Sequence, residues 1–188
     1  MLNAFLDKFI YTSTLKYVHN NFYLAEVPFT LVPTDILVGV CAEQNADFDK
    51  LLYYDVKSST LKRLIKQFDV QFGMQGDSSL KLLEDFFVAS GWGSIEVENI
   101  DPKEKRAIIK VTNSPISSSL KGKVEFPVDH MLRGIFAGMF SNYFKCPVEC
   151  VETKCFALND PQCEFVIKKA EDFDFGNKLT RRQLKVES

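Results

Sequence analysis

Three of the chain's five cysteines lie in one short stretch, ECVETKCFALNDPQCEFVI (residues 149–167). The Asp-Pro pair after Asn159 is typical of a turn, so the stretch predicts a hairpin centred near Asn159. Cys155 and Cys163 are equally far from that centre and are expected to face each other across it. Two thiolates at this separation suit a soft, tetrahedral metal ion such as zinc, which needs two further ligands.

The remaining ligands are expected from the same strand and from the start of a helix. Glu152 lies three residues before Cys155, and in a flat strand these side chains point to opposite faces, so shared ligation predicts a bulge or bend near Thr153. The segment VDHM offers Asp129 and His130 as the fourth ligand. Two alternatives remain open. The cysteines pack as small apolar groups with Glu152 in an ion pair, or they form a disulfide, which a reducing compartment disfavours.

The composition excludes several classes of protein. With 188 residues, of which 46% are hydrophobic, the chain suits one domain with a substantial core. Its 23 Lys and Arg against 25 Asp and Glu leave no charge excess for nucleic acid, and the basic end, Lys178–Ser188, is expected to be a solvated or frayed terminus. No apolar run approaches the about 20 residues of a membrane span, and five cysteines argue against a secreted disulfide framework. We therefore expect a cytoplasmic protein.

Periodicity predicts helices and extended segments in the first half of the chain. Residues 2–10 have helical spacing, and residues 22–33 read as extended chain broken by Pro28. A helix is expected to begin near Thr34, and helical periodicity then continues to about Ala89.

The second half predicts two hairpins around one helix. Residues 94–101 and 105–113 alternate as two paired strands, and the last two strands flank the turn at Asn159. Between the hairpins, PVDHMLRGIFAGMFSNYF predicts a helix with Pro127 in its first turn. Gly134 and Gly138 of this helix allow close approach of another backbone, and we expect them on the inner side of the sheet.

Several segments together resemble the vinyl-4-reductase (4-vinyl reductase) domain family over about residues 55–170. They are GWGSIEVENID, NSPISSS, FPVDHMLRGIFAGMF and VECVETKCFALNDPQCEFVIKK, and the positions that match the family's tail pattern are Glu152, Cys155, Cys163, Phe165 and Ile167. The resemblance implies an α+β fold, with an antiparallel sheet packed against helices in a single domain like the TRAPP Bet-type subunits, and a homodimer. Residues 1–54 are then an N-terminal extension packed on this domain, and residues 171–188 a C-terminal tail.

The resemblance also implies a zinc site. In sensor members of the family the glutamate, the two cysteines and a further cysteine at the helix start bind zinc, so Glu152, Cys155 and Cys163 are the implied ligands here. The fourth position falls on Asp129, which departs from the family pattern, with His130 beside it. Zinc with four protein ligands is structural, because catalysis needs an open coordination position.

The function that the resemblance implies is binding or sensing of a small hydrophobic or aromatic molecule. The expected cavity lies against the glycine-bearing helix, and its predicted lining is Ile135, Phe136, Met139, Phe140 and Trp92. A dimeric scaffold without a ligand is the alternative, followed by a component of tetrapyrrole vinyl reduction. The sequence shows no nucleophile with a partnered base, no phosphate loop and no dinucleotide fingerprint, so catalysis is not expected.

Overall fold

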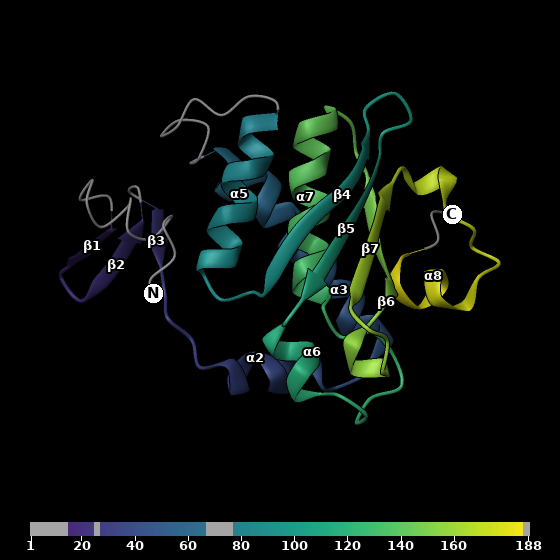
Figure 1. Cartoon of the computed structure of the whole chain (residues 1–188), viewed down its shortest axis with the longest axis horizontal. Coiled ribbons are helices and arrows are strands. Elements are labelled where there is room, and N and C mark those ends of the chain that lie inside the picture. The colour runs from purple at the N-terminus through teal and green to yellow at the C-terminus, as the bar shows by residue number, and fades with distance from the viewer. Residues whose placement is uncertain (1–14, 25–26, 67–76, 186–188) are drawn as a thin grey trace.

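The computed structural model describes residues 15–24, 27–66 and 77–185. The helix predicted at residues 2–10 lies outside this part of the chain. A three-stranded antiparallel sheet at one end of the molecule precedes the helices of the first half (Figure 1). The elements are β1 (Leu15–Val18), β2 (Asn21–Leu24), β3 (Val27–Phe29), α2 (Thr34–Cys41), α3 (Ala46–Ser59), the π-helical turn η1 (Thr60–Leu64) and α5 (Asp77–Ala89).

The second half of the chain forms a four-stranded antiparallel sheet in the order β4-β5-β7-β6, with α3, α5 and α7 on one face (Figure 1). Both predicted hairpins are present, and the helix expected near Thr34 is α2. The elements are β4 (Ser94–Asp101), β5 (Arg106–Thr112), α6 (Pro115–Ser119), α7 (His130–Phe144), β6 (Glu149–Lys154), η2 (Phe156–Leu158), β7 (Cys163–Lys168), η3 (Ala170–Asp172) and α8 (Lys178–Gln183).

Helix α7 is the central element of the core. It begins at His130, three residues after Pro127, so the prediction that Pro127 lies in its first turn is wrong. Asp129 precedes the helix, and its backbone angles, φ −84° and ψ 48°, are not helical. Its amide donates a hydrogen bond to the Glu152 carboxylate. The start of α7 is therefore set by contacts with β6.

The two glycines of α7 contact α3. A Cβ atom on Gly134 would lie 2.7 Å from the carbonyl oxygen of Tyr53 and 2.8 Å from Cβ of Val56. At Gly138 it would lie 2.8 Å from Cβ of Thr60. The predicted close approach of another backbone is confirmed, but the expectation that both glycines face the sheet is wrong.

The core lies between α7 and the inner face of the sheet. Alternate residues of β5 and β7 are buried, as period-2 strands with one covered face require. The ring of Phe136 packs edge-on against Phe165, with centroids 5.1 Å apart. The buried residues of β5 and β7 in this layer are Ala107, Ile109, Val111, Cys163, Phe165 and Ile167.

Edge strand β6 has its outward backbone groups bonded by side chains. The amide of Cys150 donates to the Tyr53 hydroxyl at 2.9 Å, and its carbonyl accepts from Arg133 Nε at 3.1 Å. Two residues further on, the side-chain amide of Gln183 bonds both the amide and the carbonyl of Glu152, each at 2.9 Å. Paired edge groups offer no template to another strand, so this edge is closed to β-sheet extension.

The C-terminal segment docks on the sheet next to β6. Gln183 and Leu184 are 2% and 0% exposed, and Arg182 reaches α3. The expectation of a solvated or frayed terminus is therefore wrong for α8 and the residue that follows it. Among the residues that the structure describes, no helix is long and apolar enough to cross a membrane.

Candidate metal centre

Four ionisable side chains from separate segments meet beneath α6. Asp129 lies just before α7, Glu152 in β6, Cys155 directly after β6, and Cys163 at the start of β7. One ligand atom from each lies within 4.8 Å of all the others, and all four residues are 0% exposed. We call these residues the acid–thiol group. They are the Asp, Glu and two Cys that the sequence predicts as ligands.

An irregularity in β6 turns Glu152 and Cys155 to the same side. Glu152 pairs with Phe165, but Lys154 pairs with Glu164, so Thr153 is one residue too many for its partner strand. This is the bulge that shared ligation required, and that prediction is confirmed. The extra residue reverses the alternation of side chains after Glu152 and directs Cys155 inward.

The hairpin loop holds the thiols in place through backbone bonds. The amide of Cys155 donates to the Asp160 carboxylate at 2.8 Å, and the amide of Phe156 donates to Sγ of Cys163 at 3.3 Å. Asn159 has φ 71°, the left-handed conformation that asparagine tolerates and that this tight loop needs.

Burial and mutual proximity govern protonation in the acid–thiol group. Burial raises the pKa of Asp129 and that of Glu152, and the nearby Asp129 charge raises the pKa of Glu152 further. The hydrogen bond from Cys163 lowers the pKa of Cys155 to about 7 and raises that of Cys163. Cys155 is therefore the first thiol to ionise.

The donor set fits a divalent metal ion with a preference for sulfur and oxygen. Two thiolates and two carboxylates in one buried cluster repel one another unless they bind protons or a cation. Within the described part of the chain, Oε1 of Glu152 is buried without a hydrogen-bond partner. A buried acceptor without a donor costs free energy, which a metal ion at this point removes.

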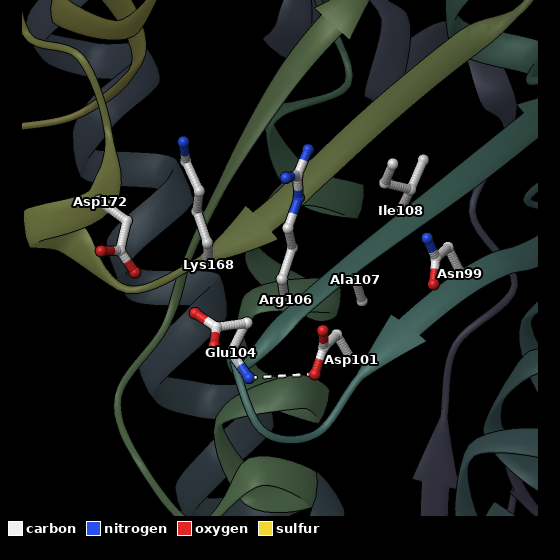
Figure 2. A pocket seen from close by; sticks show the side chains of 8 residues that line it. All are labelled: Asn99, Asp101, Glu104, Arg106, Ala107, Ile108, Lys168 and Asp172. Atoms are coloured by element: carbon white, nitrogen blue, oxygen red, sulfur yellow. Dashed lines mark hydrogen bonds between the residues drawn. The ribbon is translucent and has the colours of Figure 1, made fainter.

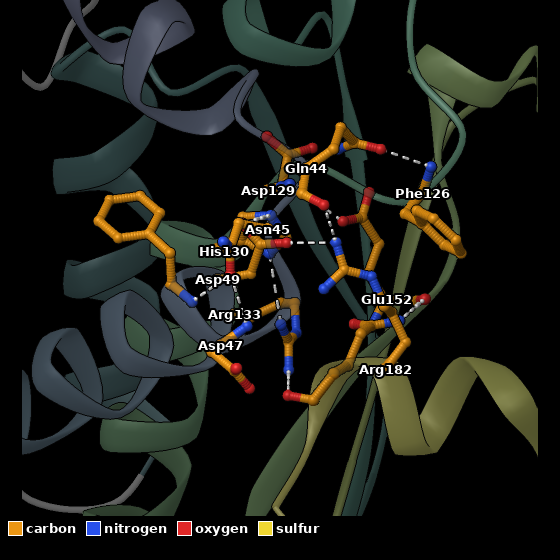
Figure 3. Close-up of polar contacts among 12 residues, drawn as sticks. Gln44, Asn45, Asp47, Asp49, Phe126, Asp129, His130, Arg133, Glu152 and Arg182 are labelled. Atoms are coloured by element: carbon orange, nitrogen blue, oxygen red, sulfur yellow. Dashed lines mark hydrogen bonds and ion pairs between the residues drawn. The ribbon is translucent and has the colours of Figure 1, made fainter.

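His130 belongs to a different cluster (Figure 3). Its Nε2 lies 3.3 Å from the Asp49 carboxylate, and its Nδ1 lies 3.5 Å from Nη1 of Arg133. Because Arg133 only donates, Nδ1 is the accepting nitrogen and the ring proton is on Nε2. Burial and the charges of Arg133 and Arg182 lower the pKa of His130 to about 3, so the ring is neutral. The structure places Asp129, and not His130, in the acid–thiol group.

A buried arginine, Arg133, and a half-buried one, Arg182, hold this neighbouring cluster together, and sequence reasoning missed both. Arg133 is 0% exposed and donates from Nη2 to the Gln183 carbonyl at 2.8 Å. Arg182 donates to α3 and its preceding loop, at 2.7 Å to Asp49 Oδ2 and 2.7 Å to Gln44 O (Figure 3). The only sequence signal was an arginine in the apolar stretch MLRGIFAGMF.

The predicted ligand-binding residues lie in the core of the domain. Phe136 and Phe140 are 1% and 0% exposed, and Ile135 and Met139 are also buried. Trp92 is half-buried, with its ring centroid 6.3 Å from that of Phe87. Their role in binding stays a prediction.

A separate hollow of about 390 Å³ lies at the β4–β5 turn and contains none of the predicted site residues (Figure 2). Burial and the neighbouring Arg106 lower the pKa of Lys168 in it. Its lining mixes both charges, and it consists of Asn99, Asp101, Glu104, Arg106, Ala107, Ile108, Lys168 and Asp172.

Comparisons with known proteins found one match in sequence and several similar structures. Residues 107–169 match the family model of the vinyl-4-reductase domain. The phenol-responsive sensory domain of the transcription activator PoxR, solved with phenol, is similar with a TM-score of 0.72 and 16% identity, over 97% of each chain. At this identity the likeness shows a shared fold, and the expected α+β architecture is confirmed. No curated protein matches the chain in sequence.

Two other solved structures are less similar. A trafficking protein particle complex subunit 3 from Naegleria fowleri, covalently bound to palmitic acid, has a TM-score of 0.47 and 20% identity over 72% of this chain and 86% of that one. A vinyl-4-reductase family protein from Methanocaldococcus jannaschii has a TM-score of 0.47 and 16% identity over 76% and 98%. The matched residues 107–169 include the whole acid–thiol group, so this segment of the chain is similar in sequence to the vinyl-4-reductase domain.

Proposed function

We propose that the acid–thiol group binds one zinc ion with a structural role. The observation that carries this proposal is the convergence of four buried ligand atoms within 4.8 Å of one another. Four protein ligands leave no open position for a substrate, so the ion supports the fold. Structural zinc contributes about 10–16 kcal/mol in small model sites, comparable to the about 5–15 kcal/mol stability of a whole domain. Zinc therefore clamps the β6–β7 hairpin to the start of α7.

Metal analysis of one matched pair of variants tests this proposal. We expect about one zinc per chain in protein purified without added metal, and a lower thermal midpoint after chelation. Cys163→Ser should lower the zinc content and the midpoint together. Cys146→Ser is the control, because Cys146 lies outside the group and is only half-buried. X-ray absorption at the zinc edge identifies the metal, and wild-type protein with full stability and no metal contradicts the proposal.

We further propose that the domain binds a small hydrophobic or aromatic molecule between α7 and the sheet. The fold shared with a phenol-responsive sensory domain supports this class of ligand. The apolar side chains of α7 that face the sheet supply a suitable surface, with Phe136 against Phe165 of β7. A ligand at this place inserts between two rings that are in contact, so binding requires them to move apart.

The single tryptophan offers a direct assay for such a ligand. Trp92 is half-buried near Phe87, and its fluorescence should change when phenol, a cresol or a longer apolar molecule enters the layer beside it. Calorimetry on the same panel checks that the signal reports binding. A folded, metal-loaded protein that binds no member of the panel at millimolar concentration argues against a sensor.

A dimeric scaffold is the second candidate, and the N-terminal sheet favours it. A three-stranded sheet of short strands gains little stability by itself, and Figure 1 shows this one apart from the four-stranded sheet. The sheet, the chain that follows it and the start of α2 expose apolar side chains: Tyr17, Val18, Leu31, Val32 and Ile36 are between 42% and 68% exposed. A second copy of the chain is the proposed occupant of this surface.

Sedimentation equilibrium on the full chain tests the dimer. We expect a homodimer whose dissociation constant rises when Leu31 and Ile36 are changed together to Asp. The control variant is Leu61→Asp, because Leu61 is exposed and lies outside this surface. Leu37 and Val38 are unsuitable as controls, because they pack against the core and Asp there would disturb the fold. A wild-type monomer at high micromolar concentration contradicts the proposal.

A further inference from the structure

Two buried serines of the α6 segment bond the carboxylate of Asp129 from both sides. Ser114 Oγ donates to Oδ1 of Asp129 at 3.0 Å, and Ser117 Oγ donates to Oδ2. The serines are 3% and 0% exposed, so water does not compete for these hydroxyls. Ser114 also caps α6, because its hydroxyl accepts from the amide of Ser117 at 3.3 Å. The carboxylate is thus held in one plane and one rotation.

Ser117 contacts three of the four members of the acid–thiol group. Besides Asp129, its hydroxyl lies 3.3 Å from Sγ of Cys163 and 3.9 Å from Sγ of Cys155. Oδ2 of Asp129 is in turn 3.3 Å from Sγ of Cys163, so this oxygen is the one that faces the thiols. The hydroxyl of Ser117 therefore lies beside three of the four candidate ligand atoms, where it can donate a hydrogen bond to them without binding the ion itself.

We propose that Ser117, with Ser114, is a positioning residue that fixes Asp129 as a one-oxygen metal ligand through Oδ2. This inference rests on the proposed zinc site. A free carboxylate rotates between one-oxygen and two-oxygen binding, and hydrogen-bond partners behind metal ligands set the orientation that the ion meets. Here Ser114 bonds Oδ1 and Ser117 bonds Oδ2, and Oδ2 is also the oxygen that lies 3.3 Å from Sγ of Cys163, so it is the oxygen placed to bind the ion together with the thiols.

Charge gives a second reason for the serines. Two thiolates and two carboxylates carry four negative charges, so a bound Zn²⁺ leaves a net charge of 2 − 4 = −2 at a fully buried site. Such an excess is stable only with donors around it. The structure supplies the two serine hydroxyls together with the amides of Asp129 and Phe156, which donate at 3.1 Å to Glu152 and 3.3 Å to Cys163. Of these donors, only the hydroxyls are removable by substitution.

The test is zinc affinity, measured by competition with a chromophoric chelator on folded, full-length protein. We expect Ser117→Ala and Ser114→Ala to weaken zinc binding by about 10- to 100-fold. Ser118→Ala is the matched control, because it makes the same change on the exposed face of the same short helix, and its affinity should equal that of the wild type. Co²⁺-loaded Ser117→Ala should also show an altered visible spectrum, which a loss of stability alone does not produce.

A change of ligand separates positioning of Asp129 from a general effect on the site. In an Asp129→Cys background the ligand is a single sulfur atom that needs no fixed plane, so Ser117→Ala should cost much less affinity there than in the wild type. An equal loss in both backgrounds overturns the positioning role. So does a wild type that binds zinc while both serine variants bind it as tightly as Ser118→Ala. A wild type that takes up no zinc overturns the metal site itself.

Discussion

Replacing Gly134 by Ala tests the contact between α7 and α3. The added Cβ atom would lie 2.7 Å from the Tyr53 carbonyl oxygen and 2.8 and 2.9 Å from two atoms of Val56. A carbonyl oxygen and a β-branched side chain on a packed helix have little room to move, so the overpacking cost should be near the upper end of about 1–3 kcal/mol. Alanine regains about 1 kcal/mol of helix propensity. The expected net loss is about 2 kcal/mol, or about 4–8 °C in the thermal midpoint for a chain of this size.

The control is the same substitution at Gly39. Gly39 lies in α2, and a Cβ atom there has nothing within 4 Å, so Gly39→Ala should stabilise the protein by about 0.5–1 kcal/mol. Urea unfolding followed by circular dichroism, with metal-loaded protein throughout, measures both variants. The reasoning is refuted if Gly134→Ala is as stable as Gly39→Ala, because the helices would then not be held at the distance on which the cost depends.

Three other changes probe the buried polar groups. Tyr53→Phe leaves the Cys150 amide without its acceptor and removes a donor from Glu149, and chemical denaturation should show a loss of about 1–3 kcal/mol. Arg182→Ala leaves the Asp49 carboxylate, 2% exposed, without its cation, and should cost about 3 kcal/mol and increase proteolysis of the C-terminal segment; unchanged stability contradicts docking of α8. His130 has a folded-state pKa of about 3 against an ordinary 6.5, so between these values the unfolded chain binds one more proton, and the free energy of unfolding should fall by about 1.4 kcal/mol per pH unit on acidification. In metal-depleted His130→Gln the free energy of unfolding should depend on pH less steeply than in the metal-depleted wild type, by this amount between pH 6 and pH 4. Equal slopes in the two proteins contradict a buried, neutral ring.

Much of the local structure could be predicted because it depends on neighbours in sequence. The β4–β5 hairpin follows from alternation around Asp101, and the left-handed Asn159 marks the turn between β6 and β7. The bulge at Thr153 was predictable for a chemical reason, since Glu152 and Cys155 reach one ion only if the alternation is broken between them. These inferences need only the geometry of a strand and the needs of a metal ion.

The predictions that failed concern contacts between distant segments. The glycines of α7 indicated a close neighbour, but periodicity does not say whether that neighbour is the sheet or α3. The basic C-terminus looked solvated because nothing nearby in sequence pairs with Arg182, whose partner Asp49 lies 133 residues away. Likewise Ser117 stood in an ordinary polar stretch until the fold brought it against Asp129 and Cys163.

The sequence by itself determined which residues can bind a metal ion. It also determined that Cys155 and Cys163 lie at equal distances from the turn of the last hairpin and so face each other across it. Residue type left both Asp129 and His130 as possible fourth ligands at one helix start, and only the family resemblance favoured Asp129. Only the tertiary structure shows where each side chain lies. The two side chains leave the chain in different directions, so Asp129 points under α6 to the thiols while His130 points to Asp49 and Arg133. Which side chain meets which partner is decided by the packing of whole elements, and that packing depends on contacts across the entire chain.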